Sequence, residues 1–497
     1  MSSLSGAGTR RAALFALQAA VAGAVGAAAA APAYGYDFTI DVQTVGQGYQ
    51  VRRYAPSGAN EMLTRRRLTQ YLNLNVTDIA PERWRQAGDE RNALTVEVSL
   101  RFDSDFGGYL LSRPTGQNEI RELQQNRVDI LYAYLAGRDF GGRVDFQLGR
   151  QVHFDLVDFY AFDGADVAVR VRRPLVVEAF AGTEVRGERP LSSPIYELDG
   201  TSIGSQDPAT RPNQAQQLRP LVGAALAIDG WAPLSARLAY RRMWSATADA
   251  QPGDPSTGVN DEKVALTADA AWGQRLHASL GLRYNILVGL LDDQQAALRV
   301  RLSDRQWVSA EYAYLAPTFD GDSIWNIFSA GAYRDLRAVY ELTVVPGLRV
   351  SARVFFRRFE TTPGEIVDGQ DLAAGGPNSR RAEGASAGVQ WRTDRGTLRA
   401  DGYFDDGYGG RKAGGDVSGR YRMSWRTLEL EGRLSGWTWR SDLQPDTNHG
   451  VVFGAQAGGR FLITEGMHLH FLAEDNVGTL YRGQYRALAV FEVDVAL

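Results

Sequence analysis

Residues 348–356 read LRVSARVFF, so apolar side chains alternate there with polar or charged ones. Successive side chains of a β-strand point to opposite faces. Val350 and Val354 therefore share one face of an extended chain, and Arg349 and Arg353 share the other. The stretch predicts a strand with one apolar face and one arginine-rich face.

After the alanine-rich residues 12–33, the same alternation recurs along most of the chain, and no long apolar run interrupts it. Further examples are residues 94–102, 234–241, 276–284, 298–302, 336–344, 428–434 and 467–473. Counting all such segments gives about 22 strands, of which the weakest are residues 42–54, 66–79 and 167–172. The sequence thus predicts an all-β protein with an even number of about 18 to 22 strands.

Short and long connections alternate between these segments. The short ones are residues 141–142, 173–174, 229–230, 273–274, 304–305, 346–347, 394–396, 425–426 and 465–466. The long ones include residues 184–216, 245–261, 361–381 and 441–450. The Asp292-Asp293 connection is short where a long one is expected. This rhythm is typical of a transmembrane antiparallel up-and-down β-barrel with tight periplasmic turns and longer outer loops.

Two further features fit a barrel in a membrane. Residues 487–497 alternate like the other strands, and pairing of this last strand with the first would leave no exposed edge. Tryptophans lie within a few residues of the short turns, where an interfacial aromatic belt is expected. These are Trp231, Trp272, Trp307, Trp391 and Trp425.

The first 33 residues predict a secretory signal peptide. Arg10 and Arg11 precede an alanine-rich stretch, and Ala31-Pro32-Ala33 matches a small-x-small cleavage site. We expect residues 34–497 to form a single barrel domain, since no linker or compositional break divides them. The chain has no cysteine, which excludes disulfides, a lipid-modified cysteine and thiolate metal sites. A net charge of −4 gives no sign of nucleic-acid binding.

Arginines dominate the polar faces, since Lys263 and Lys412 are the only lysines. Guanidinium groups stay charged and bind carboxylate or phosphate, so a cluster of them in a pore favours anions. The pore-lining candidates are Arg237, Arg241, Arg275, Arg283, Arg299, Arg301, Arg349, Arg353 and Arg357. A structural alternative is pairing with inward acids, for which the candidates are Glu97, Glu311, Glu341, Asp401, Glu429 and Glu431. We expect the row Arg349, Arg353 and Arg357 to be the least paired.

Three short motifs resemble porin-like barrels: residues 66–75 (RRLTQYLNLN), residues 146–151 (FQLGRQ) and residues 162–165 (FDGA). The Leu-Gly-Arg-Gln segment in particular is similar to the outer-membrane alginate-export family and related polysaccharide-secretion barrels. The resemblance implies an arginine-rich lumen that conducts an anionic polysaccharide or small anionic solutes. The chain departs from outer-membrane barrels at its end, because Leu497 stands where phenylalanine or tryptophan is usual.

Histidine and aspartate clusters give weaker signals. His468 and His470 share a strand face with Glu474, but two histidines alone do not complete a metal site. His153 lies near four aspartates, Asp155, Asp158, Asp163 and Asp166, which is compatible with a calcium site or an outer-loop hydrolase. Their spacing matches no calcium loop, so a solvated acidic loop near the pore mouth is the simpler interpretation. No nucleophile elbow, phosphate loop or dinucleotide motif occurs.

The sequence therefore predicts an outer-membrane channel without enzymatic activity or cofactor. Its expected substrates are anionic or carbohydrate solutes, with polysaccharide export as a sharper hypothesis. Expected partners are outer-membrane lipid, lipopolysaccharide, the barrel-assembly machinery and periplasmic export proteins, and nucleic acid is not expected. The alternatives are a structural or surface-binding barrel with a loop-plugged lumen and a barrel hydrolase. A siderophore-type transporter is disfavoured because no room exists for its plug before the first strand.

Overall fold

The computed structural model describes residues 37–54, 60–77, 79, 93–105, 127–185, 219–244, 258–318, 332–360, 366–367, 370–371, 380–407, 410–423, 427–441, 449–479 and 483–496. Over these ranges the chain forms strands joined by turns and contains no helix. Accordingly, no helix in the described residues has the length and apolar character to cross a membrane. The predicted signal peptide, residues 1–33, lies outside the described residues.

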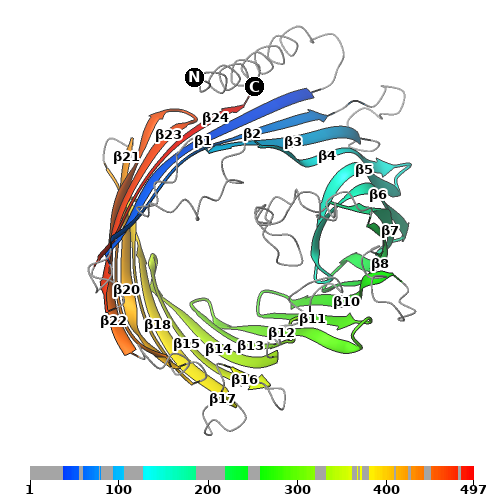
Figure 1. The fold of residues 1–497 in the computed structure, drawn as a ribbon. Coiled ribbons are helices and arrows are strands. Elements are labelled where there is room, and N and C mark those ends of the chain that lie inside the picture. Colours follow the sequence, from blue (N-terminus) through cyan, green and yellow to red (C-terminus); the bar gives the residue numbers. More distant parts are fainter. Residues whose placement is uncertain are drawn as a thin grey trace, which may run out of the picture.

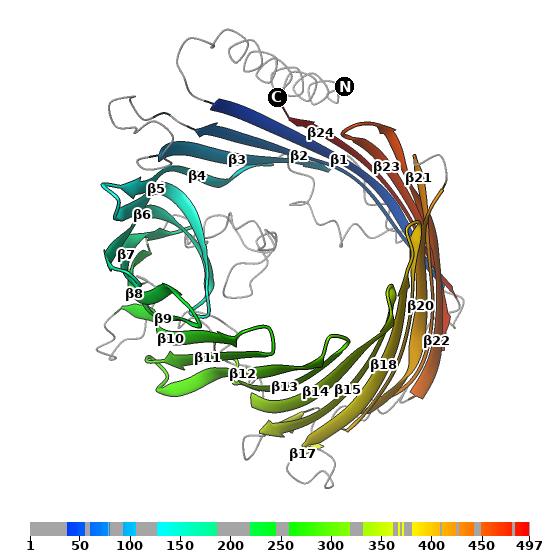
Figure 2. The same cartoon turned by 180° about the vertical axis from the view of Figure 1, so that it is seen from behind.

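A single antiparallel sheet of 22 strands closes on itself. Closure depends on β1 (Asp37–Tyr54) and β24 (Gly483–Ala496), which pair from Asp41 opposite Ala496 to Tyr54 opposite Gly483. Figure 1 shows the strands as a ring in which β1 lies beside β24, and Figure 2 shows the same ring from behind. The predicted all-β barrel is confirmed, at the upper end of the expected strand number.

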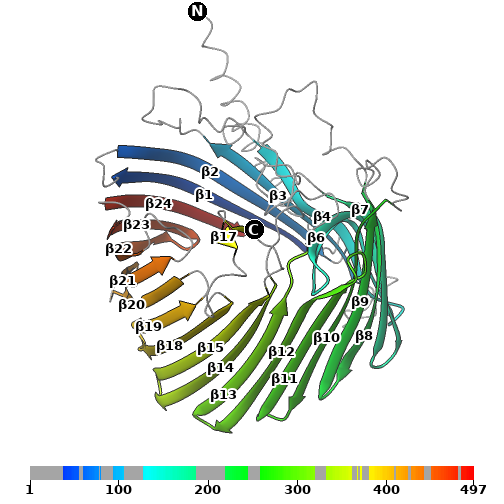
Figure 3. The same ribbon diagram turned by 60° about the horizontal axis from the view of Figure 1, so that its bottom comes forward.

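The first half of the wall runs from β1 to β11, and Figure 3 shows the strands lying side by side around it. After β1 its strands are β2 (Asn60–Thr77), β3 (Ala93–Asp105), β4 (Arg127–Phe140), β5 (Val144–Phe154), β6 (Phe159–Arg172), β7 (Leu175–Glu184), β8 (Pro220–Trp231), β9 (Leu234–Trp244), β10 (Val259–Trp272) and β11 (Leu276–Asn285). The segments 42–54, 66–77 and 167–172 are all parts of strands, as predicted. Residue 79 is not in a strand, and residue 78 lies outside the described residues.

The second half completes the ring. Its strands are β12 (Leu290–Ser303), β13 (Gln306–Leu315), β14 (Ala332–Val345), β15 (Leu348–Glu360), β18 (Arg381–Arg392), β19 (Gly396–Gly407), β20 (Gly410–Arg422), β21 (Leu428–Ser441), β22 (His449–Thr464), β23 (Met467–Gly478) and β24. Between β15 and β18, β16 (Ile366–Val367) and β17 (Gln370–Asp371) form a separate two-stranded sheet.

Tight turns join the strands at one end of the barrel, mostly where the sequence predicts them. They occupy residues 141–143, 173–174, 232–233, 273–275, 304–305, 346–347, 393–395 and 465–466. The turn predicted at residues 229–230 lies at 232–233, because the pairing of β8 with β9 shifts between Ile228 and Trp231. The turn predicted at residues 425–426 lies outside the described residues.

The prediction of a turn at Asp292-Asp293 is wrong. The turn occupies residues 286–289, where the Gly289 N–H donates to the Asn285 carbonyl at 2.9 Å. Gly289 has a φ of 72°, in the left-handed region that favours glycine. Asp292 and Asp293 instead belong to β12 and are buried. Inside the barrel, Asp292 pairs with Arg283, and Asp293 accepts hydrogen bonds from the Gln295 amide. The sequence pattern alone assigns these polar residues to a loop.

The outer face of the barrel is apolar along most strands. Side chains such as Leu434 and Phe453 are more than 60% exposed. Trp231, Trp272 and Trp391 are each about half exposed and lie next to tight turns, as the predicted belt requires. A continuous band of exposed apolar side chains suits contact with lipid hydrocarbon and is unsuited to water.

Changing Leu434 to arginine should test this orientation. Leu434 is 64% exposed in the middle of β21. An arginine on the lipid face near the bilayer midplane costs about 2–4 kcal/mol of folding free energy. The free energy of unfolding, measured with the barrel folded in phospholipid vesicles, should fall by this amount. The matched control is Ser435→Arg, which places the same charge on the inner face, and equal losses for the two variants would contradict the assignment of faces.

Candidate functional site

The interior of the barrel is lined by the polar faces of the strands. On β9, Leu238 points outward and is 47% exposed, whereas its neighbours Arg237 and Ala239 point inward. The same alternation continues through the paired strands, so the arginine rows predicted on β9, β11, β12 and β15 face the lumen. Their partners decide which of them offer a free positive charge.

Arg237 and Arg241 are held in ion pairs. Arg237 donates to both carboxylate oxygens of Glu178, each at 2.7 Å. Arg241 is only 2% exposed and pairs with Asp158 at 2.9 Å and with Asp261. A buried guanidinium requires such partners, because burial of an unpaired charge costs several kcal/mol. These two arginines therefore hold the lumen wall together and contribute little free charge.

Arg283 and Arg299 are also paired. The Arg283 Nε donates to Asp292 at 2.8 Å, and Asp292 has no solvent exposure. Arg299 donates to Glu341 at 2.9 Å across β13. Glu341 is one of the predicted acidic partners. Asp292 is not among them, because the sequence pattern places it in a turn. Pairing across two strands depends on the register, which no single segment of sequence reveals.

Trp307 lies on the lumen face of β13, which corrects its predicted place in the interfacial belt. Its ring is covered by Arg299 at 4.6 Å and approached by Arg301 at 5.6 Å. Arg301 also donates to Asp304 at 2.9 Å. Cation–π contacts hold these guanidinium groups against the ring. Proximity to a turn was a poor guide here, because strand parity decides which side of the barrel a side chain occupies.

Arg349 and Arg353 are exposed on the inner face of β15 and form no ion pair with any described residue. Arg357, in the same row, donates twice to Asp335 at 3.0 and 2.6 Å, and Asp335 is fully buried. The expectation of a poorly paired row is thus correct for two of its three members. Asp335 also accepts two hydrogen bonds from Arg337, so one carboxylate neutralises part of two guanidinium charges.

Arg275 lies at the end of the barrel and not on the inner face of a strand. It belongs to the exposed turn 273–275, and its carbonyl accepts a hydrogen bond from the Arg301 backbone at 2.8 Å. Its place at the rim still brings it near the mouth of the lumen.

The β5–β6 hairpin bends into the barrel, as Figures 1 and 2 show. At its tip, Val157 is 2% exposed and packs with Ala225, Ala239 and Ala265 on the inner wall. Leu156 packs against the same cluster. Small alanines on β8, β9 and β10 leave room for the tip, and burial of a valine side chain contributes about 1.5–3 kcal/mol.

Ionic contacts surround this apolar anchor. Asp158 pairs with Arg241 at 2.9 Å and with Lys263 at 3.6 Å. The Leu156 carbonyl accepts a hydrogen bond from Arg283 at 3.4 Å. The Asp155 side chain accepts hydrogen bonds from the backbone N–H groups of Val157 and Asp158 and so stabilises the turn at the tip. The predicted pore arginines on β9 and β11 thus hold the hairpin that narrows the lumen.

Below the tip, an aromatic cluster fills the space between the hairpin and the wall. Tyr160, Phe162 and Phe180 are at most 5% exposed and pack with Leu221 and Met243. A hydrophobic cluster inside a barrel lumen fixes the hairpin against the wall, because water cannot replace these contacts.

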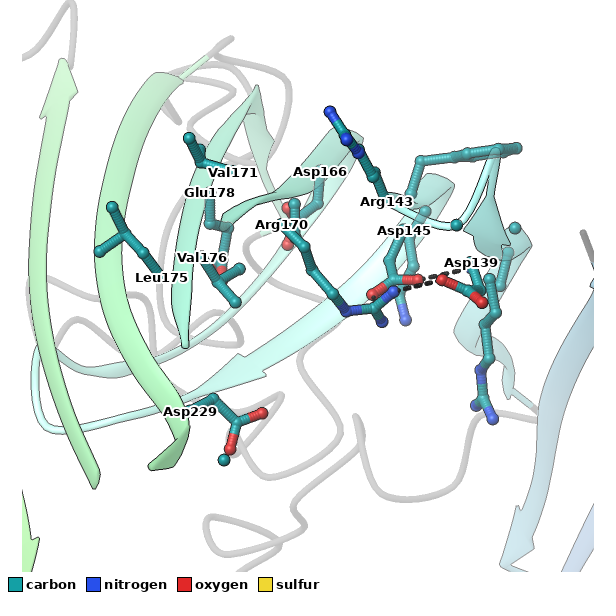
Figure 4. A pocket seen from close by; sticks show the side chains of 18 of the residues that line it. Asp139, Arg143, Asp145, Asp166, Arg170, Val171, Leu175, Val176, Glu178 and Asp229 are labelled. Atoms are coloured by element: carbon teal, nitrogen blue, oxygen red, sulfur yellow. Dashed lines mark hydrogen bonds and ion pairs between the residues drawn. The ribbon is translucent and has the colours of Figure 1, made fainter. Parts of the chain in front are cut away.

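A cavity of about 1810 Å³ adjoins the hairpin and extends to the tight turns of β4–β9. Figure 4 shows Arg170 pointing toward Asp139 and Asp145, while Arg143 points away from them. Arg170 pairs with the two aspartates at 2.6 and 2.5 Å. Asp229 lies across the cavity from this group.

The aspartates near His153 do not converge on one site. Asp163 pairs with Arg150 at 2.7 Å, and Asp155 and Asp158 serve the hairpin tip. Only Asp166 contacts His153, at 3.0 Å. His153, Asp166 and Glu178 form the one group among the described residues that could hold a metal ion. Asp166 contacts His153, and Glu178 accepts from Arg237, so both carboxylates already have polar partners.

His468 and His470 share the lumen face of β23, as predicted, but they have different surroundings. His470 pairs with Glu431 at 2.5 Å across β22. The Nδ1 atom of His468 is buried without a hydrogen-bond partner among the described residues. The two imidazoles therefore do not act as a pair of ligands for one ion.

The sequence matches no protein-family model, and it matches no curated protein. Among solved structures, the outer membrane protein opdK from Pseudomonas aeruginosa is 10% identical, with a TM-score of 0.41 over 93% of this chain and 99% of that chain. OccAB4 from Acinetobacter baumannii is 8% identical, with a TM-score of 0.43 over 93% and 98%. A BenF-like porin from Pseudomonas fluorescens Pf-5 is 8% identical, with a TM-score of 0.40 over 92% and 99%. The resemblance to alginate-export barrels stays a prediction.

Release of the hairpin should expose Ala265, which is 3% exposed in the cluster with Val157. The chain has no cysteine, so a single Ala265→Cys change reports on this position alone. Its reaction with a membrane-impermeant maleimide should be at least about ten-fold faster when Val157→Ser and Asp158→Asn are added. These changes remove the apolar and ionic contacts of the tip and so lower the free energy needed to detach it from the wall.

An Arg349→Cys variant provides the matched control, since this position is exposed in the lumen whether or not the tip is docked. Its labelling rate should be the same in both backgrounds. Fast labelling of Ala265→Cys with the native tip would show that the hairpin is not docked.

Proposed function

We propose that this protein is an outer-membrane channel that lets small polar solutes diffuse through its lumen, with a preference for anions. The observation that carries the proposal is the closed 22-strand sheet whose outer face is apolar and whose inner face is charged. A closed barrel satisfies every backbone hydrogen bond in hydrocarbon, and barrels larger than about 16 strands leave an aqueous interior.

The anion preference rests on Arg349 and Arg353. They are exposed in the lumen and have no acidic partner among the described residues, whereas most other predicted pore arginines are neutralised. Unpaired positive charge on a pore wall raises the local concentration of anions. Diffusion through such a lumen requires neither catalysis nor a bound cofactor.

The docked hairpin supports a channel that selects by size as well as by charge. Its side chains contact the inner wall from β7 to β11, whereas the polar side chains of β14, β15 and β18–β23 face the lumen. The rival proposal of a plugged structural barrel predicts that no ions pass. Polysaccharide export is a special case of the channel, in which a longer anionic chain occupies the same lumen.

The proposed location in the outer membrane implies further partners for the protein. Outer-membrane lipid and lipopolysaccharide would contact the apolar outer face, and the barrel-assembly machinery would insert the chain after export. Residues 1–33 are proposed to direct that export and to be removed. Periplasmic export proteins would be needed only for the polysaccharide form of the function.

Conductance in planar lipid bilayers provides the test. Combined Arg349→Ala and Arg353→Ala changes should lower the anion-to-cation permeability ratio by about two-fold or more, because they remove two unpaired positive charges from the β15 wall. The single-channel conductance should change less than the selectivity. The measurement is the reversal potential under a potassium chloride gradient.

The charge-matched control combines Arg275→Ala with Arg395→Ala. Both residues are exposed in tight turns at the rim, so their loss changes the net charge equally without altering the wall. Equal effects of the two pairs would contradict the role of Arg349 and Arg353. A folded, inserted barrel without conductance would exclude the channel and favour the plugged structural barrel.

A further inference from the structure

A second cavity, of about 830 Å³, lies on the inner face of β18–β23. These strands stand across the ring from the β5–β6 hairpin in Figure 1. The cavity is lined by residues that directly oppose one another on neighbouring strands. Its polar lining includes Ser386, Arg399, Asp401, Tyr403, Asp416 and Arg433. We call it the β19–β21 groove.

Tyr403 lines one end of the groove, and Trp437 lies beside it just outside the lining. The Lys412 Nζ is 5.4 Å from the centroid of the Tyr403 ring and 4.2 Å from that of the Trp437 ring. Tyr403, Gly414 and Trp437 lie side by side on β19, β20 and β21. Because Gly414 has no side chain, both rings lean over it, and their centroids are 6.0 Å apart in an edge-to-face arrangement. A Cβ atom on Gly414 would lie 2.2 Å from the Gly436 carbonyl oxygen and 2.7 Å from the Trp437 Cα and Cβ. The close approach of β20 to β21 at this point therefore requires glycine.

Below the rings, two aspartates face each other across the strands, and each has its own arginine. Asp401 lies opposite Asp416 in the β19–β20 pairing. Arg399 donates two hydrogen bonds to Asp401, at 2.5 and 3.0 Å. Arg433 pairs with Asp416 at 3.2 Å. Two like charges at directly opposed positions would be destabilising without these partners.

The charges of the groove balance. Arg420 is the third arginine of the lining and pairs with Glu429 at 2.9 Å and with Glu431 at 3.6 Å. The lining therefore carries three guanidinium groups and three carboxylates. The carboxylates are those of Asp401, Asp416 and Glu431. This differs from the β15 wall, where Arg349 and Arg353 have no acid beside them. A small ion would gain little net attraction from these lining residues, and Lys412 adds one positive charge at the end with the rings.

The arginines of the groove are about half exposed or more, so their unused N–H groups face the lumen together with carboxylate oxygens. A ligand with several hydroxyls can donate to the carboxylates and accept from the guanidinium groups at once. Hydrogen bonds of this kind are stronger than those between neutral groups. The Tyr403 hydroxyl is buried and has no partner among the described residues, so it is a further group that a ligand could satisfy after a small shift.

We infer that the β19–β21 groove binds a neutral saccharide, with the apolar face of a sugar ring against Tyr403 and its hydroxyls on the Arg399–Asp401 and Arg433–Asp416 pairs. The inference rests on the proposed channel function and names a substrate class for it. The balanced lining gives an ion little net attraction, and the combination of an aromatic ring with paired donors and acceptors fits a polyhydroxylated ligand.

Maltohexaose is the probe, and polyethylene glycol of similar mass is the size control. Added to the native channel in planar bilayers, maltohexaose should cause resolved current blockades, whereas polyethylene glycol should not. Tyr403→Ala should shorten the mean blockade at least about ten-fold, as expected for loss of about 1.4 kcal/mol of binding. Tyr403→Phe keeps the ring and should retain most of the blockade time. Tyr132→Ala, on β4 elsewhere in the lumen, is the matched control and should have no effect.

Calorimetric titration of maltohexaose into the full-length barrel in detergent micelles separates this inference from the channel proposal. Conductance without Tyr403-dependent blockades or heat would overturn the saccharide site and leave the channel intact. Tyr403-dependent heat without conductance would support the site and reject the channel. Binding of an oligogalacturonate but not of maltohexaose would overturn the assignment to neutral sugars. Retained heat-modifiable migration on gels confirms that each variant is folded.

Discussion

Closure of the sheet is the constraint on which the rest of the structure depends. Pairing of β1 with β24 gives every barrel strand two neighbours, so no row of backbone N–H and C=O groups is left open. Once the sheet is closed, each strand has an inside and an outside, and the two-residue period assigns every side chain to one of them. The exposed leucines, phenylalanines and tryptophans of the outer face and the ionic rows of the lumen are two results of this one geometry.

Inside the barrel, the paired charged side chains stabilise the wall and the docked hairpin. Arg241 and Lys263 are almost fully buried because Asp158 and Asp261 lie beside them, and this cluster holds the hairpin tip against the wall. Breaking one member of such a buried network costs more than the pair contributes, since the remaining charge has no solvent. The hairpin is therefore held against the lumen wall by Val157, which packs against alanines, and by the ion pairs around it.

The lumen consequently has walls of different character. One sector is filled by the hairpin, the β15 sector offers unpaired arginines, and the β19–β21 groove offers paired charges beside aromatic rings. A solute that moves through this lumen meets positive charge and balanced hydrogen-bonding groups within a few strands of each other, because Arg353, Ser386 and Tyr403 lie on consecutive strands at the same level. Neighbouring strands are only about 4.8 Å apart, so one extended solute can contact both surfaces.

The sequence by itself determined the barrel, its strand number near 22, most of the tight turns and the facing of the arginine rows, because alternation and turn residues are local properties of the chain. It could not determine which arginines are neutralised. Arg357 and Arg353 are equivalent in the pattern, yet only Arg357 meets a buried aspartate, Asp335, on the neighbouring strand. The inward turn of the β5–β6 hairpin, the lumen position of Trp307 and the strand position of Asp292 were likewise decided by the tertiary structure. The ion pairs and the docked hairpin depend on the register and packing of strands that are distant in the chain. Trp307 and Asp292 were misplaced because nearness to a turn reveals neither the parity nor the first residue of a strand.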